Sequence, residues 1–191
     1  MDDINIILAS SSKRRIELLK IITDNFKVIP SNIDETVPNN IESFKIAEYL
    51  AEKKALKVNK NQKNDLVLGC DTIVIIDNKV LGKPSNRQDA YSMLKTLSGR
   101  IHNVVTGCCI IYNGHRKIFH ETTKVEFYNL TDDEIDKYIL SEEPFDKAGS
   151  YAIQGKGALL IKKIDGDYYN VVGLPISRIN KEICYIKNLN K

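Results

Sequence analysis

The sequence predicts a mixed α/β fold, with a sheet flanked by helices, in one domain that spans residues 1–191. The chain opens with a strand, a loop and a helix, and its apolar run Leu66–Ile76 is typical of a strand buried on both faces. Further on, Asn113-Gly114 separates two strand-like stretches and predicts a β-hairpin. Strands that first alternate with helices and then group as hairpins indicate a sheet that is not purely parallel.

Five elements are predicted in the first half of the chain. Ile4–Ala9 and Phe26–Pro30 are short apolar runs and are expected to be strands. Between them, Arg14–Ile22 carries apolar residues at helical spacing, and Ile41–Val58 does so over a longer stretch. Leu66–Ile76 is the central strand, and Asp71 is the one charged residue inside it.

The second half contains the hairpins and three more helices. Asn86, with Asp89 three residues later, predicts a helix start, and Thr131 with Glu134 forms a capping box. The expected elements are strand Lys79–Leu81, helix Asn86–Leu97, strands Val104–Tyr112 and Lys117–Phe127, helix Thr131–Ser141, strands Ala158–Ile164 and Tyr168–Val172 around the turn Asp165-Gly166, and helix Ile176–Ile186.

Composition narrows the classes of function. A net charge of +3 without a basic stripe, and the absence of tryptophan, argue against a nucleic-acid partner. No apolar segment approaches the roughly 18 residues of a membrane span, and the acidic start lacks a secretory signal. The four cysteines and three histidines form no zinc pattern, so we expect mostly buried thiols in a reducing compartment. These observations predict a cytoplasmic protein that binds a small anionic ligand.

Asp71 is the first candidate for chemistry. A carboxylate inside an apolar strand must be paired, hydrogen-bonded or bound to a cation, because an isolated buried charge is costly. Glu35, next to Asp34, is the natural second carboxylate, since Mg²⁺ needs only one or two carboxylates when phosphates complete its shell. The alternatives are an aspartate that accepts backbone N–H groups and a solvated acidic loop.

A second candidate is the segment Ser10–Arg15, between a strand and a helix. Serine hydroxyls, free N–H groups and paired guanidinium groups suit a phosphate. The alternative is a serine N-cap followed by solvated basic residues, and neither is favoured by spacing alone. The segment lacks the glycines of a Walker loop.

The remaining candidates are weaker signals. Lys54, beside the apolar stripe of its helix, and Lys83, in the rigid Gly82-Lys83-Pro84, offer charges for phosphoryl groups. The glycine-rich stretch Gly149–Gly157 permits close approach to a ligand, and the amide of Gln154 carries both a donor and an acceptor for a base edge. Taken by itself, however, this stretch is better explained as an ordinary glycine-containing loop.

Taken together, these segments resemble the Maf family of nucleotide pyrophosphatases, from Leu8 to about Pro175. The resemblance is carried by Leu8-Ala9-Ser10-x-Ser12-x-Arg14-Arg15, Asp34-Glu35-Thr36, Gly69-x-Asp71-Thr72, Gly82-Lys83-Pro84, Asp146-Lys147-Ala148-Gly149, Ile153-Gln154-Gly155 and Val172-Gly173-Leu174-Pro175. Lys13 stands where the family usually has proline, a change that removes no ligand group.

The resemblance implies an elongated mixed α/β fold similar to that of inosine triphosphate pyrophosphatases, with two lobes around a cleft, a homodimer, and dependence on Mg²⁺ or Mn²⁺. It implies that Asp71 is the general base and also a metal ligand together with Glu35. Lys54 and Lys83 would assist catalysis. The triphosphate would be held by Ser10, Ser12, Arg14 and Arg15, in addition to the two lysines.

The resemblance also bears on the substrate. Thr72 after the catalytic aspartate and Gln154 in the Ile-Gln-Gly block are similar to the family branch that prefers dTTP and UTP. The expected reaction yields the monophosphate and pyrophosphate. Two alternatives are a pyrophosphatase for 7-methyl-GTP and a nucleotide-binding regulator of cell division whose hydrolysis is incidental.

Overall fold

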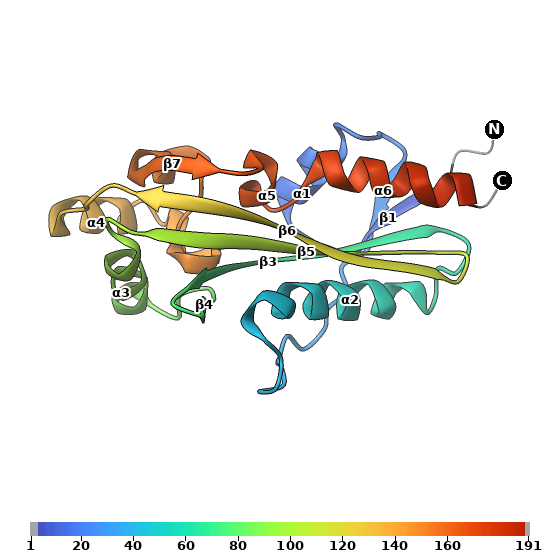
Figure 1. The fold of residues 1–191 in the computed structure, drawn as a ribbon, viewed down its shortest axis with the longest axis horizontal. Helices are drawn as coiled ribbons and strands as arrows, with labels where there is room; N and C mark the ends of the chain where they lie inside the picture. Colours follow the sequence, from blue (N-terminus) through green and yellow to red (C-terminus); the bar gives the residue numbers. More distant parts are fainter. Residues whose placement is uncertain (1–3, 190–191) are drawn as a thin grey trace. The chain divides into compact units, whose positions relative to one another are not determined.

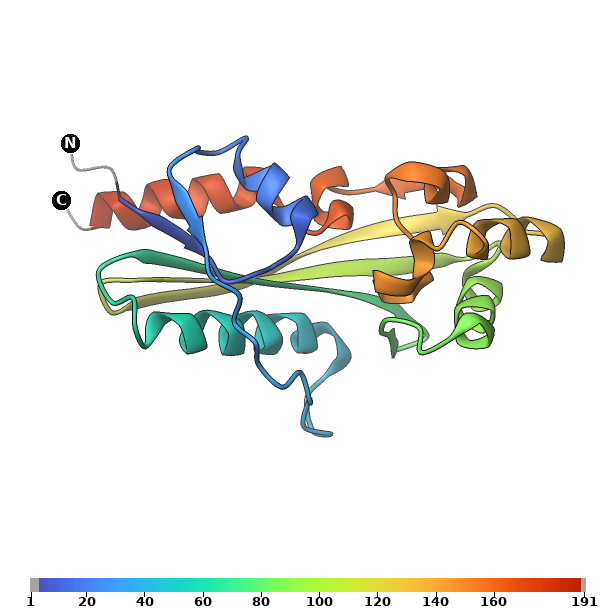
Figure 2. The same cartoon turned by 180° about the vertical axis from the view of Figure 1, so that it is seen from behind.

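The computed structural model describes residues 4–189 of the chain (Figure 1 and Figure 2). The strands are β1 Ile6–Leu8, β2 Phe26–Val28, β3 Leu66–Ile76, β4 Lys79–Leu81, β5 Ile101–Tyr112, β6 His115–Phe127 and β7 Ile161–Asp165. The α-helices are α1 Lys13–Leu19, α2 Ile46–Asn59, α3 Arg87–Leu97, α4 Asp132–Ile139, α5 Tyr168–Val172 and α6 Ile176–Leu189. Short 3₁₀ helices are η1 Ser43–Lys45, η2 Glu143–Asp146, η3 Ala148–Ser150 and η4 Gly155–Leu160.

The strands within residues 4–189 form one seven-stranded sheet in the order β2-β1-β3-β5-β6-β7, and β4 pairs with β3 outside this path. Strand β1 runs parallel to β2 and β3, whereas β3 with β4 and β6 with β7 are antiparallel. The predicted mixed α/β fold is therefore confirmed. No helix in this part of the chain is both long enough and apolar enough to cross a membrane.

The chain divides into two compact units. The first contains the residues up to Asp71, Thr106–Glu121 and the residues from Gly173 onward; the second contains Thr72–Val105 and Thr122–Val172. Strands β3, β5 and β6 each contribute residues to both units, and β3 passes from one unit to the other between Asp71 and the next residue.

In the first unit, α2 covers one face of the strands, and α1 and α6 lie on the other face (Figure 1 and Figure 2). The apolar core between α2 and the strands includes Ile7, Ala51, Ala55, Val67 and Cys109. The small alanine side chains leave the helix backbone close to the strands, so this core is thin and tightly packed.

Two strand glycines permit this close approach. A Cβ atom added to Gly69 on β3 would lie 2.3 Å from the Ala51 carbonyl oxygen, and one added to Gly107 on β5 would lie 2.3 Å from the Ala47 carbonyl oxygen. Both distances are far below van der Waals contact, so only glycine fits at either position. The two glycines therefore fix the distance between α2 and the strands of the first unit.

The second unit has its own core, built around β5, β6, α3 and α4. Its buried residues include Leu94, Leu97, Phe127, Ile135 and Ile139. The predicted helix starts are confirmed: Asn86 accepts a hydrogen bond from the Asp89 backbone N–H, and Thr131 with Glu134 forms the capping box of α4. The Asn113-Gly114 turn between β5 and β6 is also found, with positive φ at both residues.

The region after Gly157 differs from the prediction. Residues 158–160 belong to the 3₁₀ helix η4, and the strand begins only at Ile161. Tyr168–Val172, expected to be a strand, is the helix α5. The Asp167 carboxylate accepts the Tyr169 backbone N–H, and the buried Asn170 amide donates to the Val104 carbonyl and to Thr123 Oγ1. The local bond of Asp167 and the two long-range bonds of Asn170 together override the β-propensity of two tyrosines and two valines.

Candidate active site

Asp71 lies near the middle of β3 in the first unit, and only 8% of it is exposed. Lys54 reaches it from α2 and is equally buried, with its Nζ atom 2.6 Å from Asp71 Oδ1. The same Nζ atom lies 2.7 Å from Glu35 Oε1. The expectation that a carboxylate in this strand must be paired is therefore confirmed, and its partner is a lysine that was only a weak signal in the sequence.

The thin core explains how Lys54 comes to Asp71. Ala51 and Ala55, on the same helix, pack against Gly69, two residues before Asp71 on β3. Because the helix is held so close, the lysine side chain is covered by protein and its ammonium group has to find partners there. Two carboxylates satisfy this requirement.

The surroundings of Asp71 act on its pKa in opposite directions. Burial raises the pKa of the Asp71 carboxyl, and the positive charges of Lys54 and Arg15 oppose this rise; the net result is a raised pKa. A carboxylate with a raised pKa accepts a proton more readily, as a general base must.

Arg15 binds backbone carbonyls next to this pair. Its Nε atom donates to the Gly173 carbonyl at 2.9 Å, and its Nη1 atom donates to the Cys70 carbonyl at 2.9 Å and to Ser10 Oγ at 3.4 Å. Cys70 immediately precedes Asp71, so the guanidinium group helps to fix the backbone that carries the acid. Through these bonds the serine–arginine segment lies beside the backbone that carries Asp71.

The two serines of this segment have different surroundings. Ser10 is buried, and its Oγ atom accepts the Ser12 backbone N–H at 3.3 Å. Ser12 is the N-cap of α1 and accepts the Arg15 backbone N–H at 3.5 Å, a long and therefore weak capping bond. Arg14 is partly buried on the same helix. The capping alternative accordingly describes part of what Ser12 does.

Glu35 lies in a loop whose conformation is set by its neighbours. Asp34 Oδ1 accepts hydrogen bonds from the Thr36 hydroxyl at 2.7 Å and from the Thr36 N–H at 3.0 Å, and these bonds hold the pKa of Asp34 below its usual value. The Glu35 side chain is 53% exposed. Since Glu35 and Asp71 share one ammonium group, their carboxylates face the same point.

The carboxylates of Glu35 and Asp71 supply only part of the ligands that a hard cation needs. Within residues 4–189, no group of three or more histidine, cysteine, aspartate or glutamate side chains could hold a metal ion. Two carboxylates nevertheless match the way Mg²⁺ binds with substrate phosphates, which supply the remaining oxygens. The residues present therefore fit a cation that arrives with a phosphorylated ligand.

Three other predicted residues belong to the second unit. Thr72 is half-buried on β3, whereas Lys83 and Gln154 are exposed. The loop of Lys83 is held by a hydrogen bond from the Gly149 N–H to the Gly82 carbonyl at 2.9 Å, which joins two of the blocks noted in the sequence. Gln154 precedes η4, and its side chain makes no capping bond to that helix.

Sequence reasoning assigned no role to several groups that organise these regions. Gly173 supplies a carbonyl to Arg15, and its block had been noted without a function. Glu143 accepts the backbone N–H groups of Lys156 and Gly157 beside Gln154. No local pattern identifies Glu143, because its partners are main-chain groups distant in sequence. The cysteines behave as expected: Cys70, Cys108 and Cys109 are buried free thiols, and Cys184 is exposed.

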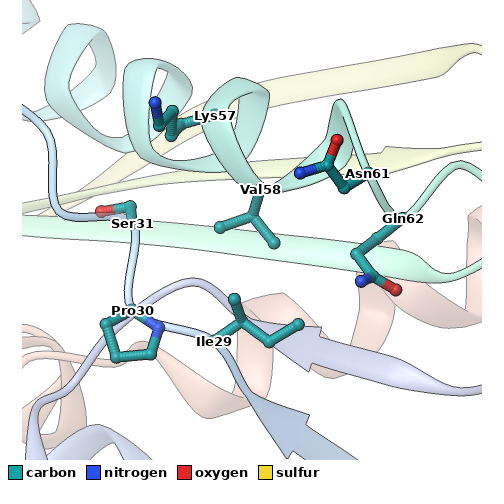
Figure 3. Close-up of a pocket in the computed structure, with 7 residues that line it drawn as sticks. All are labelled: Ile29, Pro30, Ser31, Lys57, Val58, Asn61 and Gln62. Carbon is teal, nitrogen blue, oxygen red and sulfur yellow. The ribbon is translucent and has the colours of Figure 1, made fainter.

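A shallow pocket of about 170 Å³ lies in the first unit, between the segment after β2 and the C-terminal end of α2 (Figure 3). It is lined by Ile29, Pro30, Ser31, Lys57, Val58, Asn61 and Gln62. None of these residues was predicted to act in catalysis or binding, and the volume is small for a nucleotide. The pocket therefore does not mark the site of the chemistry.

Known proteins resemble this chain over nearly its full length. Residues 5–185 match the family model described as Maf-like protein. A dTTP/UTP pyrophosphatase of Bacillus cereus is 48% identical over 178 residues, which cover 93% of each chain. The dTTP/UTP pyrophosphatase of Bacillus mycoides is 49% identical over the same length and coverage.

Solved structures with the same fold are more distant. A nucleoside-triphosphatase / dITP/XTP pyrophosphatase of Mycobacterium abscessus aligns with a TM-score of 0.50 at 14% identity, covering 96% of this chain and 98% of that one. A HAM1 protein of Coxiella burnetii aligns with a TM-score of 0.50 at 17% identity, covering 96% and 100%. Identities this low bear on the fold alone, and they confirm the fold class that the sequence led us to expect.

Proposed function

The chain belongs to the family of Maf-like proteins, and from this premise we propose that it hydrolyses dTTP and UTP to the monophosphate and pyrophosphate. The observation that carries the proposal is the buried pair of Asp71 and Lys54, shared with Glu35 and bordered by Arg15. A buried acid–lysine pair is costly to maintain, and perturbed, desolvated acids of this kind concentrate where chemistry occurs.

In the proposed reaction, Asp71 takes the proton of the attacking water. The oxygen of that water forms a new bond to phosphorus, the anhydride bond between the α- and β-phosphates breaks, and pyrophosphate leaves with the bond electrons. Lys54 and Lys83 neutralise charge on the phosphoryl oxygens. Phosphoryl transfer is mainly a matter of positioning and charge stabilisation, which these residues supply.

We assign the other predicted residues to the substrate. Ser10, Ser12 and Arg14 bind the triphosphate, and Arg15 holds the backbone beside Asp71 while its charge adds to the field on the phosphates. Thr72 and Gln154 recognise the pyrimidine base, since a hydroxyl and an amide can pair with its O4 and N3–H edge.

Nucleotide hydrolysis of this type generally takes a divalent cation, and we propose Mg²⁺ or Mn²⁺. Glu35 and Asp71 would hold it together with phosphate oxygens, because their carboxylates converge on one point in the first unit. When bound, such a cation neutralises phosphate charge and lowers the pKa of water.

Chromatographic identification of products from dTTP, UTP and 7-methyl-GTP with Mg²⁺ tests the proposal. We expect the monophosphate and pyrophosphate from the first two nucleotides. Release of diphosphate and phosphate would refute the reaction, and preferential loss of 7-methyl-GTP would refute the role given to Thr72 and Gln154. Tight binding of nucleotide without turnover would instead favour a regulatory protein.

Four coarser properties complete the proposal. We propose that residues 1–191 act as one domain, because three strands run through both units. A homodimer follows from the family resemblance, and light scattering during gel filtration measures it. A cytoplasmic location agrees with the four free thiols. The partner is a small nucleotide, with no role for a nucleic acid.

A further inference from the structure

The 3₁₀ helix η4, which follows Gln154, has its first N–H groups bound by a distant carboxylate. Glu143 Oε2 accepts the Lys156 N–H at 3.0 Å, and Glu143 Oε1 accepts the Gly157 N–H at 3.1 Å. Gly155 follows Gln154 and immediately precedes these two N–H groups in the chain. Its φ is +73°, and a Cβ atom added to it would lie 2.6 Å from Glu143 Oε2. The carboxylate of Glu143 therefore fits closely against the turn made by Gln154 and Gly155.

This arrangement leaves the Gln154 amide available. The first N–H groups of a helix are usually accepted by the side chain of its N-cap residue. Here Gln154 is the N-cap, yet its side chain makes no such bond, and it is exposed. Because Glu143 satisfies these N–H groups instead, the Gln154 amide keeps its donor and its acceptor for a ligand.

The carboxylate of Glu143 is itself held in place. The Tyr138 hydroxyl donates to Glu143 Oε1 at 3.1 Å and accepts the Ala152 N–H at 3.2 Å. Tyr138 is buried on α4, whose capping box and core contacts make it a rigid support. The carboxylate and the backbone on either side of Gln154 are thus connected through one tyrosine.

A second anchor lies on the other side of Ala152. Tyr151 is buried, its hydroxyl is 2.7 Å from His102 Nε2, and its ring packs edge-on against Phe127 with the centroids 4.8 Å apart. Residues 151–157 are therefore fixed at both ends, and Gln154 is the exposed residue between the two anchors.

We propose that Glu143 is a positioning residue that sets the selectivity for the base by fixing the backbone under Gln154. The inference rests on the proposed function, in which Gln154 pairs with thymine or uracil. Guanine presents the same pattern as thymine, an acceptor at O6 and a donor at N1, but its edge lies farther from the sugar because a purine has a second ring. A glutamine on a loose backbone can move back to suit the longer base, whereas a fixed backbone holds the amide at the distance of a pyrimidine.

The variant Glu143→Gln tests this, because it keeps the size of the side chain but replaces one acceptor with a donor that faces a backbone N–H. We expect KM for dTTP to rise about tenfold, kcat to change less than about threefold, and the kcat/KM preference for dTTP over dGTP to fall about tenfold. Glu142→Gln is the matched control: it removes the same charge from the neighbouring exposed residue, and its kinetics should equal those of the wild type.

Amide hydrogen exchange gives a readout that does not depend on activity. The N–H groups of Lys156 and Gly157 should exchange faster in Glu143→Gln than in the wild type or in Glu142→Gln. Tyr138→Phe, which removes only the hydroxyl, should give a smaller change of the same kind in selectivity and in exchange. It serves as the test variant if Glu143→Gln does not fold.

The outcomes separate the two proposals. If the wild type cleaves dTTP and the folded Glu143→Gln protein keeps the wild-type preference over dGTP, Glu143 does not position Gln154. An equal loss of kcat for both nucleotides, with the preference unchanged, leads to the same conclusion. If the wild type cleaves neither nucleotide, the proposed function fails, and hydrogen exchange then decides the role of Glu143. Unchanged exchange at Lys156 and Gly157 in Glu143→Gln would overturn that role. Faster exchange at these two residues would support the conclusion that Glu143 fixes the backbone.

Discussion

The two units of the molecule differ in which of their polar side chains are buried and in how the buried ones are paired. In the first unit, Asp71 and Lys54 are buried side by side, and each is satisfied mainly by the other. In the second unit, buried polar side chains such as those of Tyr138 and Asn170 bind backbone groups, while the side chains assigned to the ligand, Lys83 and Gln154, are exposed. The first unit thus encloses a charged pair, and the second holds the backbone around an exposed side chain.

Under the proposed function, the first unit holds the acid that activates water, and the second holds the residues that recognise the base of the nucleotide. A buried charge pair provides a preorganised field, but it is stable only while both partners are present. A loop whose backbone is held by several hydrogen bonds can lose one of them and still fold, but it then positions its ligand-binding side chain less precisely. Changes to the buried pair in the first unit should therefore cost activity and stability together, whereas changes to the support of Gln154 in the second should mainly alter selectivity.

The largest effect is expected from Asp71→Asn. The amide preserves the shape of the side chain but cannot accept the proton of water, so turnover should fall at least about a thousandfold, equivalent to about 4 kcal/mol of barrier. Pyrophosphate release measures the turnover, and circular dichroism checks that the protein is folded. Asp24→Asn, at an exposed position, is the control. Unchanged turnover in Asp71→Asn would remove the acid from the mechanism.

Lys54→Met comes next, because it removes one partner of the buried pair and retains the aliphatic stem. We expect the free energy of unfolding in urea to fall by about 3 kcal/mol, the lower end for a broken buried pair, since Arg15 still offsets part of the charge on Asp71. Lys57→Met, exposed on the same helix, should change it by less than about 0.5 kcal/mol. Equal losses in the two variants would show that the pair is not what stabilises the first unit.

Acid should destabilise the second unit through His102. Burial lowers the pKa of His102 to about 4, against 6.5 in the unfolded chain. Between these values the unfolded state binds a proton that the folded state does not, so about 3 kcal/mol of stability, present above pH 6.5, is lost as the pH falls to about 4.

The measurement for His102 is urea unfolding at several pH values. His102→Gln cannot be protonated, so its stability should fall less steeply than that of the wild type over this range. Parallel pH profiles for the two proteins would contradict the assignment.

The smallest effect concerns Ser12, at the N-terminus of α1. Ser12→Ala should cost about 0.5 kcal/mol of stability, the lower end for a lost N-cap, because the capping bond is long. Ser12→Asp keeps a good cap and should leave stability nearly unchanged, but its charge should raise KM for dTTP about tenfold by repelling phosphate. If KM stays constant in Ser12→Asp, the serine only caps the helix and does not bind the substrate.

Much of the fold could be predicted because its signals are local. The β-branched run around Asp71, the Asn113-Gly114 turn and the capping box at Thr131 each fall within a few consecutive residues, and each is found where expected. The segment Tyr168–Val172 was mispredicted because its structure depends on hydrogen bonds from Asn170 to residues far away in the sequence.

The candidate site shows the same limit. The sequence identified Asp71 as a charge that needs a partner, but the partner depends on how closely α2 approaches β3, which Gly69 determines. Similarly, Arg15 was expected to bind phosphate, and its hydrogen bonds to the carbonyls of Cys70 and Gly173 follow only from the folded chain. Side-chain types could be chosen from the sequence, whereas their mutual contacts required the tertiary structure.

The glycines under α2 also constrain how this protein can vary. The atoms that an alanine at position 69 or 107 would strike are backbone atoms of the helix, the carbonyl oxygens of Ala51 and Ala47. No substitution on the helix can remove a backbone atom, so no second mutation in α2 can compensate for the loss of either glycine. The helix is consequently free to change many of its own side chains during evolution or redesign, while the two strand positions beneath it are not.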